Sequence, residues 1–384
     1  LKKFVTEADV LWKKYPAAGT SVLHLGERST ADSRTTRLLD RGAWDKPTHP
    51  VAPHVPSALH PLPADAPANR LTLARWIADR RPPLTARVAV NRVWQSLFGT
   101  GLVETPEDFG TRTPVPLHQD LLDWLAVDFM ENGWSQKHLV RTLVSSRTYQ
   151  QSSRATPAQL ERDPRNQFLA RGPRFRAEAE VVRDVALSIA GLLSPTLGGP
   201  SVFPPIPENV LAYNYSKVTY WDVPTGPDRY RRSLYVFRKR SMPDPMLSAF
   251  DAPNGDFSCV RRIRSNTPLA ALTGLNETIM VEAAQAFALR LWREGGATDA
   301  DRATHAYRLA TARAPRTAER DAVVQLVADS RTRLRQGELK AGDIAFSSLT
   351  RPIDLPADAT PIDLAAWTIA ARVILNLDET LTKN

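Results

Sequence analysis

The chain has 384 residues, of which 42% are hydrophobic, and its formal net charge at pH 7 is +9. This length and composition predict a folded protein with a sizeable hydrophobic core. No window approaches the roughly 18 consecutive apolar residues that a membrane-spanning helix needs, so we expect no membrane span. The single cysteine, Cys259, excludes an internal disulfide and a zinc site built from several thiolates.

The positive charge is spread along the chain and is not gathered in a basic tail. Arginine supplies 40 of the 50 basic residues, which stand beside 41 acidic residues. Because guanidinium groups form planar, bidentate pairs with carboxylates, we expect much of this charge to be matched inside the protein. We therefore predict no nucleic-acid partner.

The first 68 residues predict one helix followed by a long irregular segment. Apolar residues recur at helical spacing from Phe4 to Leu11, which predicts an amphipathic helix over residues 2–15. Residues 47–67 are rich in proline, which cannot extend a helix and interrupts a sheet ladder. We expect residues 1–68 to form this helix and an extended wrap or linker, separate from a domain that covers residues 69–384.

From residue 69 onward the dominant pattern is helical. Apolar residues recur at three- and four-residue intervals in the segments 71–77, 88–98, 121–129, 135–146, 178–193, 268–292, 302–312, 317–334 and 362–377. Residues 230–238 are rich in aromatic and branched side chains without Gly or Pro, which is typical of a strand. We predict a mainly α fold, an irregular helical domain with long Pro-rich loops and one small β hairpin or strand pair.

Three long motifs of this helical region resemble one family. They are NRLTLARWIADRRPPLTARVAVNRVWQSLFGTGLVETPEDFG, RGPRFRAEAEVVRDVALSIAGLLSPTLGGPSVFPP and YRRSLYVFRKRSMPDPMLSAFDAPNGDFSCVRRIRSNTPLAALTGLNE. Together they are similar to the planctomycete-type domain of unknown function 1553, found in the C-terminal region of exported proteins with a cytochrome domain. Leu117 and Ala270 depart from the family pattern, in which a small hydroxyl residue and a glutamine are usual. The resemblance implies no established activity and no catalytic residues.

The expectations on cofactors and location come from the motifs and from this resemblance. The chain has no C-x-x-C-H motif, no P-loop and no G-x-G-x-x-G motif, so we expect no cofactor in it. Three irregularly spaced histidines, His49, His54 and His60, have no acidic ligands around them, and we interpret them as loop residues. Because the chain begins at Leu1 without an export signal, we expect it to be a fragment. The resemblance implies a periplasmic or secreted location and upstream domains, one carrying haem c, as partners.

The segment 230–276 is the strongest candidate site because it combines many arginines with a predicted helix start. Asn266 or Thr267 is suited to cap a helix that begins at Pro268. A helix N-terminus beside guanidinium groups favours a bound anion. The predicted ligand-binding residues are Arg231, Arg232, Arg238, Asp251, Asp256, Arg261, Arg262, Asn266 and Thr267.

Two interpretations of these charges stay open on the sequence alone. They form either an anion site or a buried network that locks an irregular loop, with Cys259 as a small apolar residue. A second acid and base set is interpreted as structural; it consists of Arg87, Asn91, Arg92, Glu104, Glu107 and Asp108.

Three functions are compatible with this sequence. The first is an accessory or ligand-binding region of a cytochrome-linked protein, in the recognition or breakdown of anionic polysaccharides. The second is a catalytic domain, either a hydrolase with Asp251 and Asp256 as a carboxylate pair or an oxidoreductase coupled to the upstream haem. The third is a structural scaffold between domains. The sequence leaves open whether the chain is an enzyme.

Overall fold

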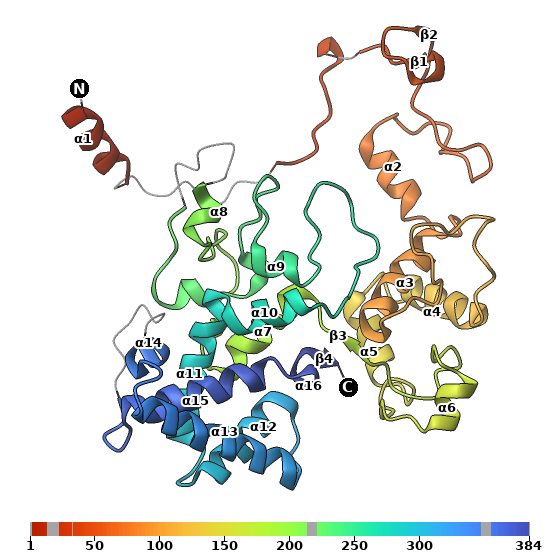
Figure 1. Cartoon of the computed structure of the whole chain (residues 1–384). Coiled ribbons are helices and arrows are strands. Elements are labelled where there is room, and N and C mark those ends of the chain that lie inside the picture. Colours follow the sequence, from red (N-terminus) through yellow and green to blue (C-terminus); the bar gives the residue numbers. More distant parts are fainter. Residues whose placement is uncertain (1, 14–22, 33, 213–220, 347–354, 384) are drawn as a thin grey trace. The chain divides into compact units, whose positions relative to one another are not determined.

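The structure is a computed structural model that describes residues 2–13, 23–32, 34–212, 221–346 and 355–383 (Figure 1). Within these ranges it has sixteen α-helices and two antiparallel strand pairs, which confirms the mainly α fold. Its packing forms two compact units, one made of residues 1–91 and 118–139 and the other of residues 92–117 and 140–384. The sequence boundary expected at residue 68 stays a prediction.

The first unit contains most of the N-terminal elements. Their bounds are α1 Lys2–Lys13, β1 Arg37–Leu39, β2 Pro47–Pro50, α2 Arg70–Ile77, the first half of α3 Thr85–Phe98, α4 Gln119–Glu131 and the start of α5 Gln136–Val144. The prediction of an uninterrupted coil over residues 47–67 was wrong at its start, because β2 pairs with β1. Proline is tolerated in this ribbon because an edge strand need not donate all of its N–H groups. Residues 14 and 15 of the first predicted helix lie outside the described residues.

Local capping signals set the helix ends in the first unit. The Asn69 side chain accepts a hydrogen bond from Thr72 N at 2.9 Å and starts α2. The predicted stop after α4 is confirmed at Asn132 and Gly133, since Gly133 has a φ of 66°. The Ser135 hydroxyl accepts from His138 N at 3.2 Å and starts α5 as predicted. These caps satisfy backbone groups that a helix end leaves without partners.

Two side-chain contacts show the roles of His60, interpreted from the sequence as a loop residue, and of Arg87, interpreted as structural. The ring of His60 stacks on Trp76 at a centroid distance of 4.9 Å, and its carbonyl accepts a hydrogen bond from the indole N–H at 2.8 Å. Arg87 on α3 donates to Asp123 on α4 at 2.6 Å. Both contacts hold neighbouring elements together.

The core of the second unit is a set of packed helices. Their bounds are α7 Ala179–Ile189, α10 Pro268–Asn276, α11 Thr278–Glu294, α12 Asp299–Thr311, α13 Thr317–Arg335, α14 Ala341–Phe346 and α15 Pro361–Leu375. α11 packs against α15, and α15 also packs against α13 and α14 (Figure 1). Their buried faces are rich in alanine, for example Ala284 and Ala366, which lets the helix axes approach closely. Trp367 and Phe287, both fully buried, fill the remaining space.

The predicted helix over residues 268–292 was wrong as a single element. It is divided into α10 and α11 at Glu277, which has extended backbone dihedrals, φ −66° and ψ 141°. The Glu277 side chain accepts from Ile279 N at 2.7 Å and starts the second helix. Apolar periodicity continues through this break, which is why the sequence did not reveal it.

The predicted strand over residues 230–238 was also wrong. The segment contains two 3-10 turns, Gly226–Tyr230 and Ser233–Tyr235, and its backbone pairs with other segments through isolated bridges at Arg231 and Val236. The second strand pair is instead β3 Phe175–Arg176 with β4 Thr382–Lys383. Strand propensity depends on tertiary context, and here the apolar run is interrupted by Arg231, which is buried and bonds to the backbone of another segment.

Five short helices have no periodic signal long enough to predict them. Four of these are α6 Pro157–Arg162, α8 Glu208–Ala212, α9 Pro245–Ala249 and α16 Asp378–Leu381, and the fifth is α14. α9 begins at the cap residue Asp244, whose side chain accepts from Leu247 N at 2.9 Å. Among the helices of the described ranges, none has the length and apolar character that crossing a membrane demands.

Candidate functional site

The candidate site lies in the second unit, in a loop between α9 and α10 that we call the pocket loop, residues 251–267. Asp251 opens it in a left-handed conformation, with a φ of 63°. Its carboxylate accepts hydrogen bonds from Ser265 N at 2.8 Å and from the Ser265 hydroxyl at 2.9 Å. One side chain therefore joins the two ends of the loop, and the non-glycine left-handed residue is held there by these bonds.

A buried arginine completes this junction. Arg176, 5% exposed, forms an ion pair with Asp251 and donates to Ser265 O at 2.8 Å and to Phe250 O at 3.2 Å. Although burial opposes the effect, the hydrogen bonds from Ser265 and the Arg176 charge lower the pKa of Asp251. Asp251 is thus ionised and fully engaged at neutral pH.

Two glutamates at the start of α7 bind the second half of the pocket loop. Arg262 lies 2.6 Å from Glu180 and 3.1 Å from Glu178. Arg264 lies 3.1 Å from Glu178 and covers the ring of Phe175, with its guanidinium carbon 4.3 Å from the ring centroid. Carboxylates in the first turn of a helix are also favoured by the helix dipole.

The other predicted arginines have different partners. Arg231, 3% exposed, donates to Pro200 O at 2.8 Å and stacks on Tyr235 with its guanidinium carbon 3.8 Å from the ring centroid. Arg232 lies 3.7 Å from Asp184. Arg238 forms an ion pair with Glu180, the residue that also binds Arg262. Arg238 and Arg262 therefore share the Glu180 carboxylate, and Arg232 pairs with Asp184 further along α7, whereas Arg231 bonds to the backbone at Pro200.

The predicted helix cap is confirmed at Thr267. Its hydroxyl accepts from Ala270 N at 3.1 Å, and Pro268 occupies the first position of α10. Asn266 is exposed and precedes the cap. One of the amides that an anion was expected to use is thus already bonded to the cap.

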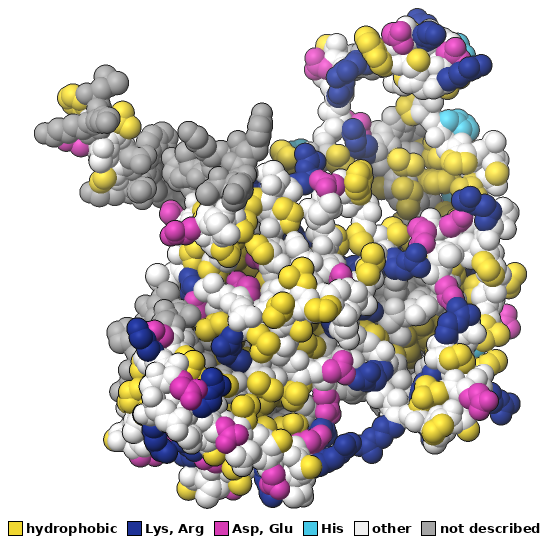
Figure 2. All heavy atoms as spheres, viewed as in Figure 1, with side chains coloured by type: hydrophobic (Ala, Val, Ile, Leu, Met, Phe, Trp, Pro, Cys, Tyr) yellow, Lys and Arg dark blue, Asp and Glu magenta, His cyan; other side chains and the backbone are white. Residues whose placement is uncertain are grey.

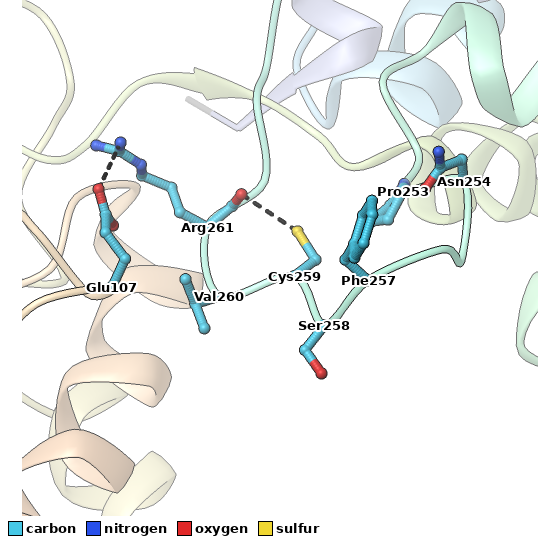
Figure 3. Close-up of a pocket in the computed structure, with 8 residues that line it drawn as sticks. All are labelled: Glu107, Pro253, Asn254, Phe257, Ser258, Cys259, Val260 and Arg261. Carbon is cyan, nitrogen blue, oxygen red and sulfur yellow. Dashed lines mark hydrogen bonds and ion pairs between the residues drawn. The ribbon is translucent and has the colours of Figure 1, made fainter. Parts of the chain in front are cut away.

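An open cavity of about 340 Å³ lies at the outer part of the pocket loop. It is lined by Glu107, Pro253, Asn254, Phe257, Ser258, Cys259, Val260 and Arg261. Figure 3 shows Arg261 extending toward Glu107 on one side and the ring of Phe257 beside Pro253 on the other. Arg261 lies 2.9 Å from Glu107, and the Cys259 thiol donates to Arg261 O at 3.2 Å. We call this cavity the loop pocket.

Of the residues that line the loop pocket, the sequence predicted only Arg261 as a ligand-binding residue. Phe257 is 86% exposed, although a phenylalanine normally buries most of its surface. Asn254 is exposed beside it and bonds to Asp256. Glu107 belonged to a set interpreted as structural, and no sequence pattern indicates its contact with a residue 154 positions away.

The two aspartates of the hydrolytic alternative have separate partners. Asp251 binds Arg176 and Ser265, while Asp256 accepts from the Asn254 amide at 2.5 Å and lies 3.7 Å from Arg240. Neither aspartate lines the loop pocket. Across the described part of the chain, no group of three or more His, Cys, Asp and Glu residues is arranged to hold a metal ion.

Deeper in the same unit, the structure brings together charged residues that the sequence did not connect. Glu282 on α11 is fully buried and binds Arg229 through two bonds, 2.9 Å from Nε and 2.5 Å from Nη2. The Tyr230 hydroxyl donates to the same carboxylate at 3.1 Å. A charge with this many bonds is satisfied, so this group is a structural cluster.

Comparison with known families agrees with the motifs described above. Residues 69–327 match the family PSD1, described as protein of unknown function (DUF1553). No curated protein and no solved structure matches the chain. Since the match covers more than half of the sequence, the chain belongs to the DUF1553 family.

Proposed function

We propose that this chain is the ligand-binding region of a longer, extracytoplasmic, cytochrome-linked protein and that it recognises an anionic polysaccharide. The observation that carries the proposal is the pocket loop, which is fixed at both ends and exposes a cavity at its tip. A loop that is already ordered loses little conformational entropy when it binds. The cytochrome link, the haem c on an upstream domain and the export rest on the family alone.

The side chains of the loop pocket suit a sugar that carries sulfate or carboxylate groups. A guanidinium such as that of Arg261 matches the paired oxygens of these anions, and the exposed ring of Phe257 offers an apolar face to a sugar ring. Asn254 adds an amide that donates and accepts hydrogen bonds. The three groups line one cavity of the same loop.

The ion pair between Arg261 and Glu107 does not prevent this role. Both side chains are about half exposed, 53% and 43%. Such pairs are worth about 0–1 kcal/mol, whereas a hydrogen bond to a charged group contributes about 1.5–3 kcal/mol. Arg261 therefore exchanges Glu107 for a ligand anion at a small cost in free energy.

Binding of a sulfated or uronic-acid glycan to the chain, measured by calorimetry at low salt, tests the proposal. We expect Arg261→Ala to weaken binding about 10- to 100-fold, which corresponds to the loss of one charge-assisted bond. The melting temperature should stay nearly unchanged because the side chain is half exposed. Added salt should weaken binding by the parent chain.

A matched control is Arg333→Ala, which removes an equally exposed arginine that pairs with Glu338 at 2.8 Å. It should leave glycan binding unchanged. Equal effects of the two substitutions, or no glycan binding by the parent chain, contradict the proposal.

A structural scaffold is the second candidate, and the pairing of Arg262 with Glu178 and Glu180 favours it. On that interpretation Arg262→Ala lowers the melting temperature sharply and the parent chain binds no glycan. The two measurements together separate a scaffold from a binding region.

A further inference from the structure

The sequence contains two Asn-Gly pairs, Asn132-Gly133 after α4 and Asn254-Gly255 in the pocket loop. An asparagine is chemically vulnerable when the backbone nitrogen of the next residue can attack its side-chain amide carbon. Glycine favours this attack because it has no Cβ that crowds the two atoms. A backbone N–H that already donates a hydrogen bond is held in place and keeps its proton, so the hydrogen bonds of each pair decide how reactive it is.

The pair after α4 is protected. Gly133 N donates to Met130 O at 3.2 Å, so the attacking nitrogen is engaged. The Asn132 amide nitrogen donates to Asp128 O at 2.9 Å and to Asp128 Oδ1 at 3.0 Å, which ties the leaving group to the end of the helix. Attack at this pair must first break these bonds.

The pair in the pocket loop has the opposite arrangement. Asn254 and Gly255 are both exposed, and a Cβ on Gly255 would meet no atom within 4 Å. In the described part of the chain, Gly255 N donates no hydrogen bond. Asn254 Oδ1 accepts from Asp256 N at 3.1 Å, and an N–H at this position stabilises the charge that develops on the amide oxygen during attack.

We propose that Asn254-Gly255 is a site of spontaneous deamidation, which makes the pocket loop a chemical clock. Gly255 N loses its proton and bonds to Asn254 Cγ. The bond from Cγ to Nδ2 breaks, and the amide nitrogen leaves as ammonia after taking up a proton from water. Water then opens the cyclic imide at either of its carbonyls, and the product is an aspartate or an isoaspartate at position 254.

The modification changes the charge of the loop pocket. Asn254 and Arg261 both line this cavity, and Figure 3 shows them on opposite sides of it. The reaction replaces a neutral amide by a carboxylate, which repels an anion bound at Arg261. The isoaspartate form also routes the main chain through the former side-chain carbon and so removes the turn between Asn254 and Asp256. This consequence for binding rests on the proposed function, whereas the chemistry does not.

Ageing of the folded chain in mildly alkaline buffer, followed by mass spectrometry of its peptides, tests the reaction. We expect Asn254 to deamidate at least about tenfold faster than Asn132, because only Asn132 must first give up its hydrogen bonds and those of Gly133 N. The rate should rise with pH, since the attacking nitrogen must lose a proton. Isoaspartate should accompany aspartate, because only the cyclic imide gives both products.

The denatured chain is the control for flanking sequence. In denaturant both pairs lose their hydrogen bonds, so the two rates should converge. Equal rates in the folded chain, rates that stay as far apart in denaturant, or aspartate without isoaspartate would each overturn the inference. Asn254→Gln keeps an amide but requires a larger ring for attack, and it should remain unmodified at position 254.

Glycan binding by fresh and aged protein tests the consequence. Binding by the parent should fall with age about two- to fivefold at low salt, the effect of one exposed charge, and by less at high salt. Binding by Asn254→Gln should not change with age, and an equal loss with age in both proteins contradicts the link to the pocket. A parent that binds no glycan refutes the proposed function and leaves the deamidation standing, whereas a glycan-binding parent whose Asn254 stays intact refutes only the deamidation.

Discussion

The second unit contains two regions that are held together by different forces: the helical core, and the irregular region formed by residues 190–267. In the helical core, α11 and α15 pack through alanines and a few large apolar residues such as Trp367. In the irregular region, buried arginines provide the bonds: Arg231 belongs to the region itself, while Arg176 on β3 and Arg183 on α7 donate to its backbone. The first region relies on non-directional apolar burial and the second on directional bonds.

The difference follows from which donors bond to the backbone carbonyls of each region. Helices bond their own carbonyls, whereas an irregular segment must find donors elsewhere. The guanidinium of Arg183 donates to Arg229 O and Arg231 O, and that of Arg176 donates to Ser265 O and Phe250 O. Because a guanidinium has five donors, one arginine replaces several missing ladder bonds. Part of the positive charge of the chain therefore has a structural role. At the surface, Figure 2 shows basic and acidic side chains interspersed over the visible face.

The largest effect should come from breaking the bond network of the irregular region at its most buried point. Glu282→Ala leaves Arg229, 8% exposed, without its carboxylate. We expect a loss of about 3–5 kcal/mol in the free energy of unfolding, because an uncompensated charge remains buried. Denaturant unfolding monitored by circular dichroism measures this change.

The matched control replaces both partners, as Arg229→Met with Glu282→Leu. If the cost of the single variant comes from the stranded charge, the double variant should recover most of the lost stability. A double variant as unstable as Glu282→Ala would mean that packing, not charge, dominates at this position.

The helical core should respond to volume rather than to charge. Ala284 is fully buried on α11, within the closely packed helices of the core. We expect Ala284→Leu to cost about 1–3 kcal/mol through overpacking. Val281→Leu, on a partly exposed position of the same helix, is the control and should change the unfolding free energy little. Equal effects of the two substitutions would show that α11 is not closely packed.

These two regions also differ in how far the sequence predicts them. Core helices such as α13 and α15 have apolar periodicity and caps, so their bounds were predicted to within a few residues. The irregular region lacks such apolar periodicity, and the aromatic run at 230–238 was mistaken for a strand because its propensity is set by context.

The candidate site was predicted only in part for the same reason. The Thr267 cap is a local signal and was found. The bonds from Arg261 to Glu107 and from Arg262 to Glu180 join segments that are distant in sequence. A single sequence gives the residues that make such contacts, but it does not show which of them are neighbours in space.

The smallest change in the free energy of unfolding should come from replacing an exposed arginine of the helical core. This substitution tests whether exposed charges matter less than buried ones. Arg333 on α13 pairs with Glu338, and both side chains are about half exposed, 58% and 48%. We expect Arg333→Ala to lower the unfolding free energy by about 0–1 kcal/mol, and by less at high salt, since water already screens the pair.

Arg331, two residues earlier, is 16% exposed and bonds to both Asp299 and Asp363. Arg331→Ala should therefore cost clearly more than Arg333→Ala in the same denaturation assay, because it removes the ion pairs of two carboxylates in a partly buried place, and only weaker partners such as the Trp367 indole and the Thr360 hydroxyl then remain. If the two variants lose equal stability, burial is not what gives arginine its structural importance, and the account of the irregular region fails with it.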